Sequence, residues 1–179
     1  GGAGYVATKL FHSLSYVKRL TVSDYSLKLL SCQGHLQTSL PSFCNLIHLE
    51  VNIGGWYLEY ERGNKEQLLN FLHISPNLKS LIFAEGYRNY ESYSNYGCSL
   101  DLVPRCLSLH LKSVEFRGFF GTELEMCLLE LFLRNARVLR RVVIILSSEL
   151  SKNWRNKKKV LNEIALFPRG SPECVLHVS

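Results

Sequence analysis

The sequence predicts an α/β fold: a solenoid with a parallel sheet on one face and helices on the other. Three observations lead to this fold. A seven-residue phrase recurs along the chain, apolar residues in each copy lie two positions apart, and the segments between copies have room for a helix. With 179 residues, 46% of them hydrophobic, the chain is long enough to bury a sizeable core.

Five copies of the spacing L-x-x-L-x-F predict five strands. The phrase is clearest in Asn77–Phe83 (NLKSLIF) and His110–Phe116 (HLKSVEF), and fainter in Asn45–Val51 (NLIHLEV). The apolar positions of the five copies are, in order, Val17, Leu20, Val22; Leu46, Leu49, Val51; Leu78, Leu81, Phe83; Leu111, Val114, Phe116; and Leu139, Val142, Ile144. A period of about 30 residues with this spacing is typical of a leucine-rich repeat.

The alternation within each strand predicts which side chains face outward. The second and third apolar positions point to one face, so the residues between and beside them point to the other. If the strands pair in register, the outward positions form three rows: Arg19, His48, Ser80, Ser113, Arg141; Thr21, Glu50, Ile82, Glu115, Val143; and Ser23, Asn52, Ala84, Arg117, Ile145. Neighbours within a row would lie about 4.8 Å apart, the usual strand spacing.

Helix start signals stand between the predicted strands. NKEQLLNFLHISP offers Asn64 as an N-cap with Gln67 three residues later, and TELEMCLLELFLRNAR repeats the arrangement with Thr122 and Glu125. The basic run SKNWRNKKK at residues 151–159 predicts the solvated face and lead-in of a further helix. Terminal repeats need special ends. FPRGSPECVLHVS therefore predicts a turn followed by a short strand, Cys174 to Val178, that closes the sheet.

No residue pattern points to catalysis, a metal or a cofactor. The six cysteines include no C-x-x-C pair, and Cys106 with His110 forms only half of a zinc-site spacing. The sequence has no H-E-x-x-H, G-x-S-x-G or phosphate-binding G-x-x-x-x-G-K-[ST] motif. We expect a protein that is not an enzyme and carries no cofactor, with reduced thiols, Cys44 and Cys127 among them, acting as small buried side chains.

Several ordered motifs resemble the C-terminal FBD domain of the plant F-box/FBD/leucine-rich-repeat proteins. Between Val103 and Cys174 these are V-P-x-C-L, L-K-x-V-E-x-R-G-F, G-T-E-x-E, F-L-x-N-A-x-V-L and F-P-R-G-S-P-x-C. YVKRLTVSDYSLKLLS and LPSFCNLIHLEV are similar to the repeats that precede this domain in the family. The resemblance implies leucine-rich repeats over residues 1–103 and an FBD domain over residues 104–179 that continues and caps the solenoid.

The resemblance also implies a protein-interaction function. In this family the F-box, which nothing before Val17 resembles, docks a Skp1-type adaptor of a cullin-based (SCF) ubiquitin ligase. We therefore expect a segment of a longer protein that holds a target protein, binds the adaptor only through an F-box outside this chain, and acts in the nucleus or cytosol. No membrane span is predicted, because the longest apolar run is far shorter than about 20 residues.

Two surfaces are predicted to contact the target. One is the outward sheet face around Glu50, Ile82 and Glu115. The other is a rim of aromatic residues in the loops after the second and third strands: Trp56, Tyr57, Tyr60, Tyr87, Tyr90, Tyr93 and Tyr96. Tyrosine and tryptophan are enriched at binding hot spots. The alternative is that these side chains only pack the long loops against the repeats.

Two other functions stay open from the sequence. A leucine-rich-repeat scaffold with no link to ubiquitin fits the same pattern. The net charge of +6 and the aromatic residues also permit RNA or DNA binding. Against nucleic acid, the tyrosine-rich loop holds Glu85 and Glu91 and a single basic residue, Arg88, and the lysine cluster lies well downstream.

Overall fold

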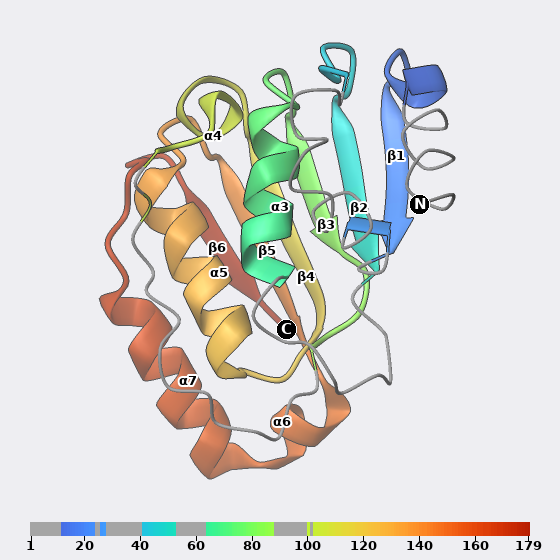
Figure 1. Ribbon diagram of the computed structural model, residues 1–179. Helices are drawn as coiled ribbons and strands as arrows, with labels where there is room; N and C mark the ends of the chain where they lie inside the picture. The colour runs from blue at the N-terminus through green and yellow to red at the C-terminus, as the bar shows by residue number, and fades with distance from the viewer. Residues whose placement is uncertain (1–11, 24–25, 28–40, 53–63, 88–99, 101) are drawn as a thin grey trace.

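The computed structural model describes residues 12–23, 26–27, 41–52, 64–87, 100 and 102–179. In this part of the chain six parallel strands form a sheet in which strand order follows sequence order (Figure 1). The strands are β1 (Arg19–Ser23), β2 (His48–Asn52), β3 (Ser80–Phe83), β4 (Ser113–Phe119), β5 (Arg141–Leu146) and β6 (Val175–Val178). The predicted α/β class and parallel sheet are confirmed, and β6 is the predicted closing strand, one residue shorter.

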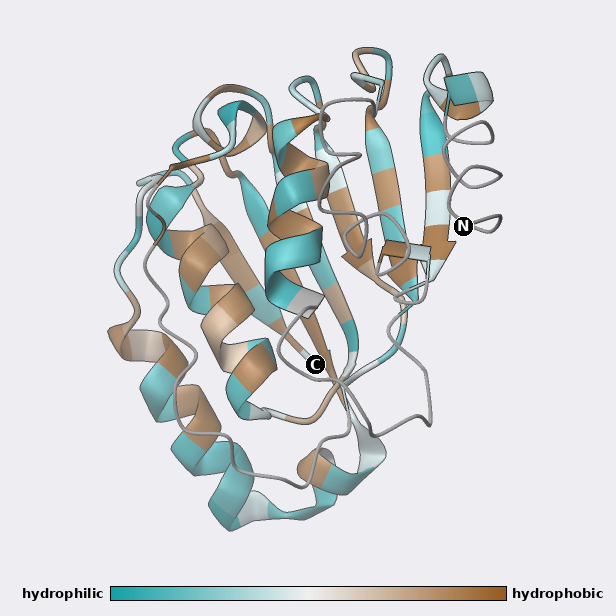
Figure 2. Ribbon diagram, viewed as in Figure 1, coloured by the Kyte–Doolittle hydropathy of each residue, from teal (hydrophilic) through white to brown (hydrophobic). Residues whose placement is uncertain are grey.

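The predicted register is also confirmed. His48 pairs with Arg19 and Ser80, and Ser113 pairs with Ser80 and Arg141. The register shifts once, in β4 between Arg117 and Phe119. Polar and apolar residues alternate along much of the strands (Figure 2). Because successive side chains of a strand point to opposite faces, the buried apolar residues lie on one face of the sheet.

The helices between strands whose bounds are described are α3 (Asn64–His73), α4 (Arg105–Leu109), α5 (Glu123–Asn135), α6 (Ser148–Lys152) and α7 (Trp154–Leu166). Helices α3 and α5 cover the same face of the sheet, and α7 lies along the outer side of α5 (Figure 1). Lys158 and Lys159 of α7 are exposed, as the basic run predicts. None of the described helices has the length and apolar character needed to cross a membrane.

The two predicted helix starts have different outcomes. Thr122 caps α5, and its N–H donates to the Glu125 carboxylate at 3.0 Å, as predicted. Helix α3 already includes Asn64. The predicted capping role of Gln67 is wrong: its side chain is buried, and its Oε1 atom accepts no hydrogen bond from the described part of the protein.

The core lies between the sheet and the helices. From β2 to β5 the second and third apolar position of each repeat is buried. Phe83 of β3 stacks on Phe116 of β4, with ring centroids 4.6 Å apart, and meets Phe132 of α5 at 6.1 Å. The repeated phrase therefore supplies one layer of core per strand.

The turn before β6 is fixed to the end of α5. The Gly170 N–H donates to the Leu133 carbonyl at 2.7 Å, and the buried Ser171 hydroxyl donates to the Leu139 carbonyl at 2.7 Å. A Cβ on Gly170 would lie 2.3 Å from the Arg134 carbonyl oxygen. The F-P-R-G-S-P segment is thus shaped by its contact with the helix end, and it places β6 at the edge of the sheet.

Candidate interaction surface

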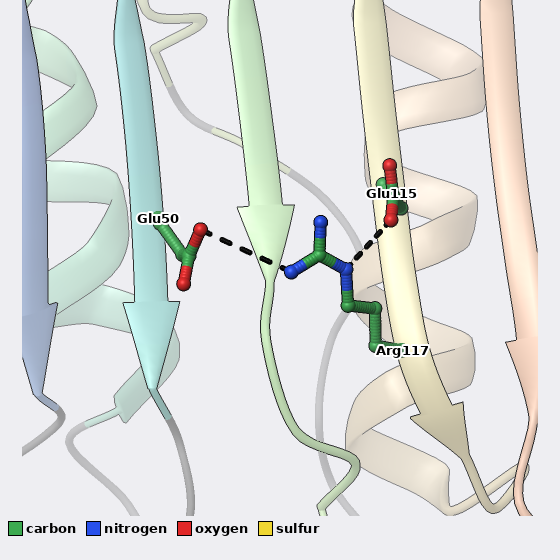
Figure 3. A network of polar contacts seen from close by, with 3 residues as sticks. All are labelled: Glu50, Glu115 and Arg117. Carbon is green, nitrogen blue, oxygen red and sulfur yellow. Dashed lines mark hydrogen bonds and ion pairs between the residues drawn. The ribbon is translucent and has the colours of Figure 1, made fainter.

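One face of the sheet has no described helix over it. Figure 3 views this face, with the helices behind the strands. All the outward positions predicted from the sequence are partly or fully exposed. They include Ile82 and Val143, which are half-buried, and Ile145, which is 39% exposed. A sheet face of this kind offers a broad surface of mixed polar and apolar character to a partner.

The three sheet residues predicted to contact a target lie side by side. Glu50 of β2 pairs with Ile82 of β3, which pairs with Glu115 of β4. The guanidinium of Arg117 joins the two carboxylates: its Nε donates to Glu115 at 2.7 Å, and its Nη1 lies 4.0 Å from Glu50 (Figure 3). The hydrogen bond with Glu115 is the main cause of a raised pKa for Arg117.

This network neutralises part of the negative charge in the middle of the sheet face, because one guanidinium meets two carboxylates. Two carboxylates on either side of an isoleucine would repel each other and any acidic partner, and Arg117 offsets that charge from one row further along the sheet. The arrangement leaves apolar area next to fixed charges, which suits specific contact with a protein surface.

Replacing Arg117 with alanine should lower the free energy of unfolding by less than about 1 kcal/mol, because both ion pairs are partly exposed. Urea denaturation of the wild type and the variant measures this difference. A loss well above that value would mean that Arg117 contributes mainly to the stability of the fold and not to partner binding.

Most of the predicted aromatic rim lies outside the described residues: Trp56, Tyr57, Tyr60, Tyr90, Tyr93 and Tyr96. Tyr87 is described. It is half-buried and packs against the core, and its N–H donates to the Glu125 Oε1 atom at 2.8 Å. For Tyr87, the packing alternative considered from the sequence therefore accounts for the contacts.

Glu125 is the most deeply buried charged side chain among the described residues, with 4% of its surface exposed. Besides Tyr87, its carboxylate accepts hydrogen bonds from the N–H groups of Phe120 and Thr122, both at 3.0 Å, and from the Thr122 hydroxyl at 3.2 Å. Burial raises the pKa of Glu125, and the hydrogen bonds act in the opposite direction with smaller effect. One carboxylate thus joins the loop after β3 to the turn between β4 and α5.

Two glycines allow this junction. Gly118 has a φ of +67°, a conformation that favours glycine, and it sits at the register shift of β4. A Cβ on Gly86 would lie 1.8 Å from the Gly118 carbonyl oxygen, so the two backbones meet where no other residue fits. Sequence reasoning missed Gly86, because nothing local distinguishes it from a glycine in an ordinary loop.

Four cysteines lie in the described part of the chain: Cys44, Cys106, Cys127 and Cys174. No group of three His, Cys, Asp or Glu side chains there could hold a metal ion. Burial raises the pKa of Cys106 to about 11, and Cys127 is buried as predicted. The prediction for Cys44 is wrong: it is exposed in a turn, between the buried Phe43 and Leu46. Those larger side chains take the core positions, and Cys44 points away.

Comparison with known proteins agrees with the predicted resemblance. Residues 101–144 match the FBD family. Two FBD-associated F-box proteins of Arabidopsis thaliana are similar to this chain. The first is 30% identical over an alignment that includes 90% of this chain and 32% of the relative. The second is 33% identical over 94% of this chain and 33% of the relative. An F-box/FBD/LRR-repeat protein of the same plant is 29% identical over 90% of this chain and 32% of its own. The chain spans about a third of the length of these curated relatives. No solved structure matches.

Proposed function

We propose that this chain, a relative of the FBD-associated F-box and F-box/FBD/LRR-repeat proteins of Arabidopsis thaliana, is the target-recognition part of an F-box-type receptor of an SCF ubiquitin ligase. Its FBD domain lies at residues 101–144. The chain holds a target protein and performs no catalysis of its own. A Skp1-type adaptor would bind through an F-box outside this chain. The site of action is the nucleus or cytosol.

The sheet face that no described helix covers carries this proposal. A sheet that grows by one strand per repeat presents a continuous row of side chains, and such surfaces are used for protein binding in repeat proteins. We interpret the sheet as a leucine-rich-repeat solenoid over residues 1–103, continued and capped by an FBD domain over residues 104–179. The similarity to an F-box/FBD/LRR-repeat protein supports this interpretation.

Glu50, Ile82 and Glu115 are the proposed contact residues on the sheet face. Ile82 supplies apolar area between the two carboxylates, and Arg117 keeps those carboxylates in place. The aromatic residues Trp56, Tyr57, Tyr60, Tyr90, Tyr93 and Tyr96 stay in the proposal as a second contact area. Tyr87 contributes by fixing the start of its loop.

A two-part binding experiment tests the proposal. In the first part, a Skp1-type adaptor is incubated with this chain and with the longer product of its gene; we expect only the longer product to bind. Binding by neither would leave a repeat scaffold without a link to ubiquitin.

In the second part, proteins cross-linked to the wild-type chain are compared with those cross-linked to the double variant Ile82→Ser, Ile145→Ser. Leu166→Ser is the control, because Leu166 is 85% exposed on α7, which packs on the helix side of the sheet. Targets lost by the double variant and kept by the control support the sheet face as the binding site. Equal capture by all three proteins would contradict it.

A further inference from the structure

The end of the sheet at which the strands begin is lined with cations. Six basic residues occupy the first position of a strand or the position just before it: Lys18, Arg19, Lys79, Lys112, Arg140 and Arg141. All six side chains are exposed. We call this set the basic rim; it lies at the upper end of the sheet in Figure 1.

Backbone hydrogen bonds fix the spacing of the basic rim. The N–H of Lys112 donates to the Lys79 carbonyl at 2.8 Å, and the N–H of Arg140 donates to the Lys112 carbonyl at 2.9 Å. The same ladder continues through Ile47 to Lys18. The rim therefore crosses five neighbouring strands, a width of about 19 Å at the usual strand spacing of about 4.8 Å.

Among the described residues, no ion pair offsets the charge of the basic rim. The described ion pairs involve Arg117 and Arg134, and within the described residues no carboxylate lies within 4.0 Å of a rim cation. His48, the first residue of β2, has a lowered pKa because of its burial and the neighbouring Arg19 and Lys79. At this end of the sheet, unlike the middle row of the sheet face, no described ion pair holds the exposed cations.

We propose that the basic rim binds an acidic segment of the target protein, whose apolar side chains then lie on the adjoining sheet face. This inference rests on the proposed function, since it names the chemistry of the target at the same face. Carboxylates of an extended segment would meet the row of lysine and arginine side chains. Apolar residues next to them would reach Ile82 and Val143, one row further along the strands.

The surface beside the rim favours a protein segment over nucleic acid. Sites for single-stranded nucleic acid combine a basic groove with aromatic side chains on which bases stack. Among the described Phe, Trp and Tyr residues at this end of the sheet, Tyr16 alone is highly exposed. Immediately beyond the rim a phosphate chain would meet Glu50 and Glu115, whereas a protein segment could place apolar side chains against Ile82.

Fluorescence anisotropy with labelled peptides tests the rim. The probe is a peptide of about eight residues, about 27 Å when extended, in which glutamate alternates with leucine. Its counterpart carries glutamine in place of glutamate, and a single-stranded oligothymidylate of similar length serves as the third probe. The variant is Lys79→Glu, Lys112→Glu, Arg140→Glu. The matched control is Lys157→Glu, Lys158→Glu, Lys159→Glu, which changes the net charge equally on α7, away from the rim.

We expect the glutamate peptide to bind the wild type and the α7 control alike, and to bind the rim variant about tenfold more weakly or worse. The glutamine peptide should bind poorly to all three. Equal loss in the rim variant and the α7 control would show a general charge effect and overturn the proposal. Tighter binding of the oligothymidylate at the rim, with a steep fall as salt rises, would overturn it in favour of nucleic acid.

These outcomes are distinct from failure of the proposed function. If the adaptor and cross-linking results hold but the rim variant keeps its captured targets and its peptide affinity, the acidic-segment inference alone fails. If the longer product never binds the adaptor, the receptor function fails, and the peptide titration still reports on the rim. Circular dichroism of the variants checks that each one is folded.

Discussion

Replacing Glu125 with alanine is expected to lower the free energy of unfolding by roughly 3–5 kcal/mol, which corresponds to a fall of roughly 10 °C in melting temperature for a domain of this size. The carboxylate accepts hydrogen bonds from the N–H groups of Tyr87, Phe120 and Thr122. Alanine would leave these donors without their acceptor next to a tightly packed core. It would also remove the link between the loop after β3 and the start of α5.

Glu123→Ala is the matched control for this prediction. Glu123 lies in the same turn of α5 but is exposed, so its loss should cost less than about 1 kcal/mol through the helix dipole. Thermal and urea denaturation of both variants measure the difference. Similar losses in the two variants would mean that the network around Glu125 contributes little beyond helix capping.

The pH dependence of stability separates the charge of Glu125 from its hydrogen bonds. Because burial raises its pKa above the ordinary value of 4.5, the folded state binds the proton more tightly than the unfolded state does. This group therefore stabilises the fold most below pH 4.5, and that contribution is lost as pH rises through the folded pKa. The difference in unfolding free energy between wild type and Glu125→Gln should fall with rising pH in that range. A difference that rises instead would mean that the hydrogen bonds outweigh burial.

The sequence predicts most of the fold, because the signals for it are local and repeated. The spacing of Leu81 and Phe83, and of their counterparts in the other copies, sets both the strands and their register. The Thr122 and Glu125 pair marks the start of α5 for the same reason. These features depend on residues within one repeat, which a periodic pattern reveals.

Features that depend on contacts between repeats could not be predicted. Glu125 is recognisable as a helix cap, but its bonds with Tyr87 and Phe120 need the loop of one repeat to meet the turn of the next. The close approach of Gly86 to Gly118 has the same origin. The basic rim is similar: its residues come from different repeats, between 28 and 61 positions apart, and only the strand pairing brings them to one end of the sheet.

Replacing Phe83 with alanine should cost about 3–5 kcal/mol, the range for a large aromatic side chain removed from a core. The ring is 2% exposed and stacks on Phe116 of β4, with interplanar angle 15°, and also meets Phe132 of α5. Alanine would leave a cavity bordered by two aromatic rings from the following repeat. Phe83→Leu keeps most of the volume and should cost about half as much or less.

The form of the unfolding transition in Phe83→Ala also tests the predicted boundary between residues 1–103 and 104–179. Phe83 lies before that boundary, while Phe116 and Phe132 lie after it. Because the core passes from one part to the other through these rings, we expect one transition moved to lower urea concentration, detected equally by fluorescence and by circular dichroism. The measurement uses a Trp56→Phe background, so that the tryptophan signal comes from Trp154 in the later part. Two separate transitions, with the signal of Trp154 retained after the first, would show that the FBD part folds without the repeats. In that case the sheet is a stack of weakly coupled units, as repeat proteins with nearest-neighbour contacts allow.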